Sequence, residues 1–511
     1  MININKSLWL DTTKTTNYEK LNGNFEIDIA IIGGGLAGIS TAYMLKKSGF
    51  NVAVFEGNRI GENATGNTTA KITSQHDLIY DKLINDFGKE NARQYADANQ
   101  SAIKKIKEII EENNIDCDFE EKIACVYTES EKYIDKIEKE VKAATSLGIT
   151  AEFAKKAALP FDIKAGVVFH NQAQFHPRKY LLALAEKVHG DGSYIFEHTR
   201  ILNVDKEDKK LILSTKDEVI TANKVIVATH FPILNSHGLY FVRMHGERSY
   251  VLGLDTKNIN VDGMYISAEN PKRSFRTQKL GGRDILLLGG ESHRTGELYN
   301  TEKCYETLKK YGEKLYGNME IIYKWSAQDM TPLDGVPYIG KYSANTENLY
   351  VATGFQKWGM TSSTVAAMII TDLINTGKSS WIDIYTPSRF KVASSIKELG
   401  GNAAKFTQRY TKGKLDSPEI SIKDIDKDEG KVVEYKGRKI GVYKDGEGNY
   451  YGVEIICPHM QCELQWNNSE KSWDCPCHAS RFTIKGEIIE GPAVKPLRTV
   501  DIDEEKIKNN I

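Results

Sequence analysis

The first clear pattern in the chain is a run of apolar positions that predicts a strand buried on both faces. Residues 27–32 read IDIAII, and a second such run, NVAVFE, follows at residues 51–56. Between the two runs, apolar positions recur at helical spacing over LAGISTAYMLKKSG, and Gly49 ends the helical pattern. A buried strand, a helix and a second buried strand in this order predict a β-α-β unit with parallel strands.

The next segments combine many charged residues with one apolar face at helical spacing. We predict helices over residues 92–110, 134–144 and 181–188, and glycines follow the second and third of them at positions 148 and 190. We interpret their apolar faces as core and assign them no chemistry.

From Tyr194 the pattern changes to short strands, which end with KVIVAT at residues 224–229. Alternating apolar and aromatic positions over residues 231–323 predict an antiparallel sheet. Another buried strand at residues 348–353 and a helical pattern at residues 361–375 indicate that the chain then returns to its first sheet. From about residue 419, short strands separated by Gly and Asn turns predict a small all-β module. The predicted fold class is α/β with an interleaved antiparallel sheet and an added β module.

Charge and composition exclude several classes of function. The 511 residues include 68 Lys and Arg against 69 Asp and Glu, so a globally basic nucleic-acid binder is excluded. No apolar run approaches the about 18 residues of a membrane-spanning helix. The N-terminal residues lack the basic and then apolar pattern of a signal peptide. We therefore expect a cytoplasmic protein that binds no nucleic acid and has no integral membrane segment.

Three glycines stand where the first strand would meet the first helix. In Gly33-x-Gly35-x-x-Gly38, the first glycine permits a tight turn, the second admits a pyrophosphate and the third allows close packing of helix and strand. Glu56 ends the second strand, 18 residues after Gly38, where an acid can accept hydrogen bonds from a ribose. The combined pattern predicts a dinucleotide site at the N-terminus of the helix.

Further motifs favour FAD over NAD and carry a family resemblance. These are GGGLAG, the loop ATGNTTAK, the segment TPLDGVPYIG at residues 331–340, and NLYVATGFQKWGMT leading into the late helix. With them, residues 26 to about 376 resemble the D-amino-acid oxidase/glycine oxidase family of FAD-dependent oxidoreductases. The resemblance implies a substrate bound over the flavin face and hydride removal from a carbon–heteroatom bond, often that of an amine. Without a Cys or His in the tethering loops, we expect non-covalent FAD.

The glycine motif, the resemblance and the loops just quoted define the expected site. We expect FAD contacts at Gly33, Gly35, Gly38, Glu56, Thr65, Thr69, Ala70, Thr229, Gly354, Gly359, Met360 and Thr361. The candidates for catalysis or substrate binding are Lys71, Arg248, Tyr250, Arg276, His293 and Lys357. An arginine could clamp a substrate carboxylate and a lysine could stabilise reduced flavin. For each arginine the alternative is structural pairing, and for each lysine it is a solvated surface position.

The C-terminal region contains a compact set of metal-ligand residues. Cys457-x-His459 and Cys475-x-x-His478 are separated by fifteen residues, and two thiolates with two imidazoles suit either zinc or a [2Fe–2S] centre. The motifs CPHMQC, SWDCPCHASRF and Gly-Pro-Ala at residues 491–493 resemble the Rieske module over about the last 95 residues. The resemblance implies that Cys457 and Cys475 ligate one iron and His459 and His478 the other, under a Gly-Pro-Ala lid.

The Rieske resemblance also has consequences beyond the ligands. It implies a disulfide between Cys462 and Cys477 and a hydrogen bond from Ser480 to the cluster. The sequence departs from the pattern at Ala479, where Gly is usual and crowding could follow. It departs again at Phe482, where many high-potential members have Tyr. We therefore expect a lower reduction potential than in quinol-oxidising Rieske proteins.

The two resemblances together suggest a domain organisation. The expected division is an N-terminal leader at 1–25, an FAD-dependent oxidoreductase domain at 26–376, a connecting arm at 377–418 and a Rieske domain at 419–511. Within the second unit, we expect FAD-binding parts at about 26–80, 150–230 and 325–376, and substrate-domain parts at about 81–149 and 231–324.

The predicted function is oxidation of a small, amine-like or amino-acid-like substrate by FAD, with electrons relayed between FAD and the cluster. An unidentified electron acceptor or donor is the expected partner, and either direction of flow is compatible with the sequence. Two alternatives remain: an amine oxidase that uses O₂ and has a regulatory cluster, and a redox sensor or electron-transfer protein.

Overall fold

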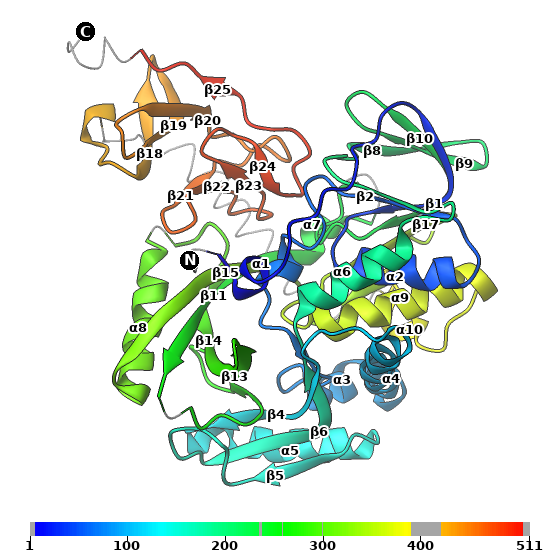
Figure 1. Ribbon diagram of the computed structural model, residues 1–511, viewed down its shortest axis with the longest axis vertical. Helices are drawn as coiled ribbons and strands as arrows, with labels where there is room; N and C mark the ends of the chain where they lie inside the picture. Colours follow the sequence, from blue (N-terminus) through cyan, green and yellow to red (C-terminus); the bar gives the residue numbers. More distant parts are fainter. Residues whose placement is uncertain (1–5, 235–237, 258, 299, 390–420, 504–511) are drawn as a thin grey trace.

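The computed structural model describes residues 6–234, 238–257, 259–298, 300–389 and 421–503, and it has two large mixed sheets with a smaller all-β module at the C-terminal end (Figure 1). The predicted α/β class with an added β module is confirmed. Most of the predicted connecting arm lies outside the described residues. Among those residues, no helix is long and apolar enough to cross a membrane.

The first sheet is built around the predicted β-α-β unit. Its strand order is β16-β17-β10-β1-β2-β7, and every pairing along this order is parallel except the antiparallel β16–β17 edge. The strands are β1 (Phe25–Ile32), β2 (Val52–Phe55), β7 (Tyr194–Phe196), β8 (Asn203–Glu207), β9 (Lys210–Ser214), β10 (Val219–Val227), β16 (Tyr338–Lys341) and β17 (Leu349–Thr353). The chain therefore does return to its first sheet after a long excursion.

Three helices pack together on one side of this sheet (Figure 1). They are α2 (Leu36–Lys47), α6 (Pro177–Val188) and α9 (Gly359–Thr376). Helix α2 contacts both of the others, so the helix that starts at the glycine turn lies between two buried neighbours.

The second sheet has the order β15-β11-β14-β13-β12-β4-β6-β3, with β5 on β6. Its strands are β3 (Lys71–Ile72), β4 (Glu120–Thr128), β5 (Ala151–Ala154), β6 (Ala165–Gln174), β11 (Met244–Thr256), β12 (Met264–Ser267), β13 (Arg273–Leu280), β14 (Arg283–Arg294) and β15 (Met319–Pro332). The associated helices are α3 (Tyr80–Phe87), α4 (Lys89–Asn113), η2 (Glu131–Tyr133), α5 (Ile134–Ser146), α7 (Tyr240–Arg243) and α8 (Glu302–Tyr316).

Two features of the second sheet differ from the expected layout. Strands β12 and β4 pair in parallel, so the sheet is mixed, because these strands come from distant parts of the chain rather than from a hairpin. Strand β6 pairs with β4 and β5 and so belongs to this sheet, although the expected FAD-binding part at 150–230 includes it. The domain limits themselves stay a prediction.

The C-terminal module consists of two four-stranded antiparallel sheets. One contains β18 (Glu429–Tyr435), β19 (Arg438–Lys444), β20 (Tyr450–Glu454) and β25 (Thr499–Val500), preceded by η3 (Ile422–Asp424). The other contains β21 (Gln465–Asn467), β22 (Ser472–Asp474), β23 (Arg481–Thr483) and β24 (Ile488–Glu490). Figure 1 shows the sheet of β21 to β24 facing the two large sheets.

Short helices at both ends of the large unit are packed into it. Helix α10 (Ile382–Tyr385) contacts α4, and the predicted N-terminal leader contains α1 (Leu8–Asp11). Trp9 is fully buried, and its indole N–H donates to the Thr68 carbonyl oxygen at 2.7 Å. The N-terminal segment therefore supports the loop around η1 (Ala64–Asn67). This loop contacts the glycine turn, because Thr65 accepts a hydrogen bond from the backbone N–H of Leu36.

Candidate functional site

The glycine turn has a different physical reason for each glycine. Gly33 has φ +109°, which favours glycine, and Gly35 is the N-cap of α2. A Cβ on Gly38 would lie 1.9 Å from the Gly33 carbonyl oxygen, so this position must be glycine for the helix to approach the strand. A Cβ on Gly35 would meet only Thr65 Oγ1, at 3.6 Å. The backbone at Gly35 is therefore open to a ligand.

The Glu56 carboxylate joins the end of β2 to this turn. It accepts hydrogen bonds from the backbone N–H of Gly34 at 2.7 Å and of Asn58 at 2.9 Å. Burial raises the pKa of Glu56, while these hydrogen bonds and Arg200 oppose the rise. A carboxylate has about four acceptor sites, so both oxygens can accept further hydrogen bonds from a ribose.

One continuous cavity extends from the glycine turn to the second sheet. The predicted residues that line it are Gly33, Gly35, Glu56, Thr65, Thr69, Lys71, Thr229, Tyr250, Gly354, Lys357, Gly359 and Met360. The cavity contains Arg59, Arg200, Lys272 and Asp329 as well, and no local motif of the sequence pointed to them.

Six predicted site residues do not line this cavity. They are Gly38, Ala70, Arg248, Arg276, His293 and Thr361. The Arg276 guanidinium donates to the carbonyl oxygens of Thr69 at 2.9 Å and Ala70 at 2.8 Å, so it supports the loop that precedes Lys71. Thr361 donates to the Thr73 carbonyl oxygen at 2.9 Å, and His293 bonds the hydroxyl of the cavity residue Tyr250 at 3.0 Å.

Ionisable groups gather in the part of the cavity next to the second sheet. Burial and the nearby Arg276 lower the pKa of Lys71 to about 7, and burial and Lys357 lower that of Lys272 to about 8. Lys71 contacts the Ser274 hydroxyl, and Lys272 is paired with Asp77. The two lysines can therefore gain or lose a proton near neutral pH, and when protonated they place positive charge next to a molecule bound in the cavity.

The predicted metal ligands lie on two adjacent loops of the C-terminal module. The Cys457 and Cys475 thiols are buried within hydrogen-bonding distance of each other, and the ring centroids of His459 and His478 are 4.9 Å apart. The contact with Cys475 is the largest of the effects that lower the pKa of Cys457 to about 7, and Ser480 adds to it. Two thiolates and two imidazoles fit a [2Fe–2S] cluster with Cys ligands on one iron and His ligands on the other.

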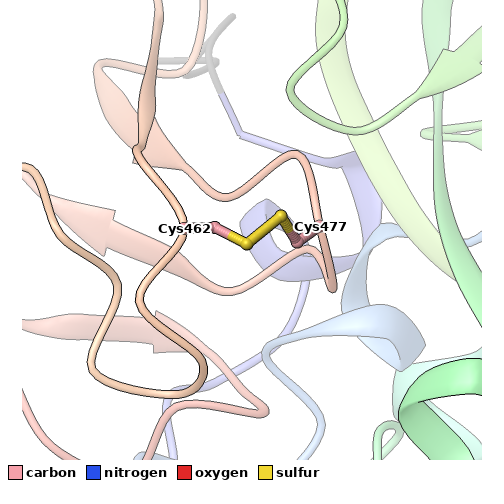
Figure 2. Close-up of a disulfide and its surroundings, with 2 residues drawn as sticks. All are labelled: Cys462 and Cys477. Atoms are coloured by element: carbon pink, nitrogen blue, oxygen red, sulfur yellow. A yellow bond between two sulfur atoms is a disulfide. The ribbon is translucent and has the colours of Figure 1, made fainter. Parts of the chain in front are cut away.

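A disulfide joins the same two loops. The Cys462 and Cys477 sulfurs are 2.04 Å apart, and Figure 2 shows them bridging the loops. Cys117, Cys125 and Cys304 are buried free thiols.

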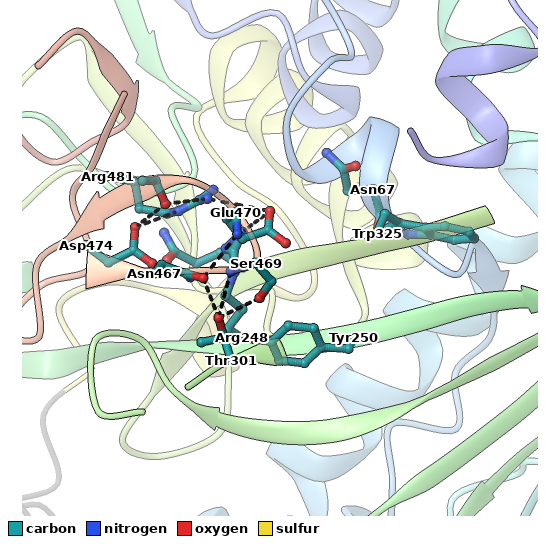
Figure 3. A network of polar contacts seen from close by, with 12 residues as sticks. Asn67, Arg248, Tyr250, Thr301, Trp325, Asn467, Ser469, Glu470, Asp474 and Arg481 are labelled. Carbon is teal, nitrogen blue, oxygen red and sulfur yellow. Dashed lines mark hydrogen bonds and ion pairs between the residues drawn. The ribbon is translucent and has the colours of Figure 1, made fainter. Parts of the chain in front are cut away.

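Charged and polar side chains fasten the C-terminal module to the second sheet (Figure 3). Arg248 of β11 is 2% exposed and donates to Glu470 at 3.1 Å. Thr301 donates to Asn467 at 2.7 Å. Within the C-terminal module, Arg481 pairs with Asp474 at 3.1 Å. Arg248 is therefore engaged in the contact between modules and does not face the cavity as a substrate clamp.

Gln328 of β15 connects the cavity to both loops near the cluster ligands. Its amide nitrogen donates to the Ala479 carbonyl oxygen at 2.9 Å and to the Glu490 carboxylate at 2.6 Å. Ala479 follows the predicted ligand His478, and Glu490 precedes the Gly-Pro-Ala segment. Gln328 itself lines the cavity, together with Ile489, Glu490, Gly491, Ala493 and Val494 from the C-terminal module.

Phe231 provides a second connection. It lines the cavity, and its ring centroid lies 6.3 Å from that of His459 and 6.5 Å from that of His478. The predicted lid therefore lines the cavity that starts at the glycine turn, and both imidazoles lie against Phe231, a residue of its wall.

The comparisons with known proteins agree with both halves of this arrangement. Residues 28–373 match the FAD dependent oxidoreductase family, DAO, and residues 418–501 match the Rieske [2Fe-2S] domain. The chain is 41% identical over 498 residues to YhfW of Bacillus subtilis (strain 168), whose name describes a Rieske 2Fe-2S iron-sulfur protein, with 98% of each chain covered.

Two further likenesses concern the larger part of the chain. Gamma-glutamylputrescine oxidoreductase of Escherichia coli (strain K12) is 22% identical over 387 residues, which are 71% of this chain and 86% of that protein. Glycine oxidase from Geobacillus kaustophilus has a similar fold, with a TM-score of 0.61 at 16% identity, over 72% of this chain and all of that structure. The chain therefore belongs to the DAO family of FAD-dependent oxidoreductases and has a C-terminal Rieske [2Fe–2S] domain.

Proposed function

We propose that this FAD-dependent oxidoreductase removes a hydride from a small amine or amino-acid-like substrate and passes the electrons, within the same chain, to its Rieske cluster. From there they reach a separate one-electron acceptor. FAD supplies the two-electron chemistry and the cluster supplies the one-electron chemistry.

The observation that carries this proposal is the shared wall of the cavity. Five residues at the Rieske lid line the same cavity as Gly33 and Gly35: Ile489, Glu490, Gly491, Ala493 and Val494. Phe231 contacts this cavity and both candidate ligand imidazoles. A cluster with only a regulatory role would not need to adjoin the flavin.

The residues that would hold each cofactor follow from the geometry. The open backbone at Gly35 would accept the pyrophosphate, and Glu56 the adenosine ribose. Cys457 and Cys475 would ligate one iron, and His459 and His478 the other. The polar surroundings of the sulfurs, including Ser480, would stabilise negative charge on them.

The substrate class is supported by the cavity and by one relative. The name of the Escherichia coli relative describes oxidation of gamma-glutamylputrescine, which contains an amine. On the side of the second sheet, the cavity offers Tyr250 and the lysines Lys71, Lys272 and Lys357. These groups could orient the polar part of a small substrate and hold it near the flavin.

The first test is an anaerobic panel of glycine, L-proline and gamma-glutamylputrescine, followed by absorption of the flavin and EPR of the cluster. We expect one class of amine to bleach the flavin and then to produce the signal of the reduced cluster. Flavin reduction that never reaches the cluster would favour the simple oxidase. No change in either cofactor with any amine would favour the redox sensor.

The matched control is His478→Ala, which should lack the cluster signal and keep the flavin. In steady state with ferricyanide as one-electron acceptor, this variant should lose turnover while its flavin is still bleached by the amine. If it keeps the full turnover of the unmodified protein, the cluster is not on the electron path.

A further inference from the structure

The proposed relay separates the electrons of the reaction from its protons. Oxidation of an amine to an imine breaks a C–H and an N–H bond and releases two electrons and two protons in total. The cluster passes the two electrons, one at a time, to the one-electron acceptor. The two protons must leave the cavity by another path and end in bulk water. This inference rests on the proposed function.

The cavity contains one carboxyl group suited to accept them. Asp329 of β15 lines the cavity, and Glu247 of β11 stands directly opposite it in the antiparallel register. Side chains directly opposite each other in such a pair have Cβ atoms about 5 Å apart. The two carboxyl groups therefore lie on the same face of the sheet as direct neighbours, and the charge of Glu247 acts on Asp329.

From Glu247, charged groups continue to the solvent. The Lys357 ammonium lies 3.6 Å from Glu247, and the His245 ring nitrogen lies 3.2 Å from it on the other side. The side chains of His245, Glu247 and Lys357 are 17%, 30% and 29% exposed. Each of them contacts water, so the set leads from the cavity to the surface.

The charges around Asp329 adjust its proton affinity. Burial raises its pKa to about 7, Lys357 and Arg248 act to lower it, and Glu247 and Glu490 act to raise it. For Glu247, burial would raise the pKa, but His245 and Lys357 outweigh burial and hold the pKa at about 2. Of the two opposed carboxyl groups, Asp329 is the one that exchanges a proton near neutral pH.

We propose that Asp329 accepts the protons released by substrate oxidation and delivers them to solvent beside Glu247 and His245. It is the group that separates proton exit from electron exit in this protein.

The test uses kcat/KM as a function of pH, measured on the complete protein with the best amine of the panel and ferricyanide. Because Asp329 must be deprotonated to accept a proton, activity falls below its pKa. Glu247→Gln removes a neighbouring negative charge and should move this acidic limb to lower pH. Lys357→Met removes a positive charge and should move it to higher pH. The pKa of the substrate amine is common to all variants and cannot produce opposite shifts.

Asp329→Asn should remove the component of the acidic limb near pH 7, leave the limb of the substrate amine, and lower kcat/KM by about 100-fold or more. A second readout needs no turnover. Infrared difference spectra of the complete protein should show protonated carboxyl bands that disappear as the pH rises through about 7. One component, that of Asp329, should be lost from Asp329→Asn and should titrate at a lower pH in Glu247→Gln. Burial also raises the pKa of Glu140 to about 7, and its component should be the same in all variants.

Three results would overturn the inference: an acidic limb near pH 7 that survives in Asp329→Asn, shifts of the same sign in the two charge variants, or no infrared component that Asp329→Asn removes. These results are separable from failure of the relay. If the amine reduces the cluster but the acidic limb near pH 7 is the same in Asp329→Asn as in the unmodified protein, the proton assignment alone is wrong. If no amine reduces the cluster, the infrared titration still decides whether Asp329 exchanges its proton near pH 7.

Discussion

At the scale of single residues, Ser480 shows how one hydroxyl can set the property of a metal centre. Its oxygen accepts the backbone N–H of the lid residue Ala493 at 3.0 Å, and its O–H lies against the Cys457 sulfur. A hydrogen bond to a ligand sulfur stabilises the reduced cluster, which carries one more electron. Ser480 thereby joins the lid to the electronic state of the cluster.

Ser480→Ala should lower the reduction potential of the cluster. One charge-assisted hydrogen bond contributes about 1.5–3 kcal/mol, which for a single electron corresponds to roughly 65–130 mV. A redox titration followed by EPR measures the shift. Ser469→Ala is the control, because the Ser469 hydroxyl contacts Thr301 instead of a ligand. An unchanged reduction potential in Ser480→Ala would show that the Ser480 hydroxyl does not stabilise the reduced cluster.

Gly35→Val should produce a folded protein without FAD. The backbone at Gly35 has φ −78°, which any residue adopts, and an added Cβ meets no atom of the protein closer than 3.6 Å. A side chain here would occupy the place of the pyrophosphate. We expect flavin absorption to disappear from the purified protein while the EPR signal of the cluster remains. Full flavin content in Gly35→Val would show that the pyrophosphate lies elsewhere.

The residues that the sequence predicts best are those whose role is local. The glycines at 33, 35 and 38 and Glu56 follow from one β-α-β unit, and the structure brings them together. Arg248 and Arg276 are candidates because they lie in the sheet region predicted to cover the flavin, and His293 because it lies in the segment GGESHRTG. Their side chains contact Glu470, loop carbonyl oxygens and Tyr250 respectively, and these long-range contacts leave no local pattern.

At the scale of elements, strands β11 and β15 carry two different functions on their two faces. Side chains alternate along a strand, so the cross-strand pair Arg248 and Gln328 faces away from its neighbour pair, Glu247 and Asp329. The first pair bonds the Rieske domain through Glu470, Ala479 and Glu490. The second pair carries the carboxyl groups assigned to proton exit. A shift of β15 by one residue against β11 would turn Gln328 and Asp329 to the opposite faces of the sheet, so that each would lose its present partners.

A glycine on β11 compensates for an unusual residue beside the cluster. Ala479 has φ +64°, a left-handed conformation that costs a non-glycine residue about 1–2 kcal/mol. A Cβ on Gly246 would lie 2.3 Å from the Ala479 Cβ. Gly246 therefore leaves the space that Ala479 occupies, and the crowding expected from the sequence is relieved by the other domain.

Gly246→Ala should weaken the docking of the Rieske domain, and Ala479→Gly should restore it in the double variant. Overpacking of this kind costs about 1–3 kcal/mol, and residues in contact show non-additive effects. Hydrogen exchange of residues 475–482 measures the docking, and we expect faster exchange in Gly246→Ala only. If Gly246→Ala and the double variant exchange equally fast, the added methyl group of residue 246 does not clash with the Ala479 side chain.

The order of the elements could be predicted from the sequence, but the partners of some strands could not. Buried runs and helical spacing gave β1, α2, β2, β17 and α9. Strand β6 lies inside the expected FAD-binding part at 150–230 but pairs with β4 in the second sheet, which the sequence could not predict because an apolar strand carries no mark of its partner. Its antiparallel pairing with β4 is a long-range contact.

At the scale of the whole molecule, the important fact is the orientation of the Rieske domain. The sheet of β21 to β24, which carries the cluster loops, faces the two large sheets (Figure 1). The buried Arg248 and Gln328 fix this orientation through hydrogen bonds of 3.1 and 2.9 Å to the Rieske domain. The sequence predicted both cofactors separately, but not that the lid would form a wall of the flavin cavity.

The most direct test of the account is the rate at which electrons move from flavin to cluster. The protein is mixed anaerobically with a reducing amine, and flavin absorption and freeze-quenched EPR are followed at several protein concentrations. We predict that the cluster is reduced after the flavin, at a rate independent of protein concentration, because the transfer is intramolecular. A cluster that stays oxidised beside reduced flavin, or a rate that rises in proportion to protein concentration, would contradict the relay.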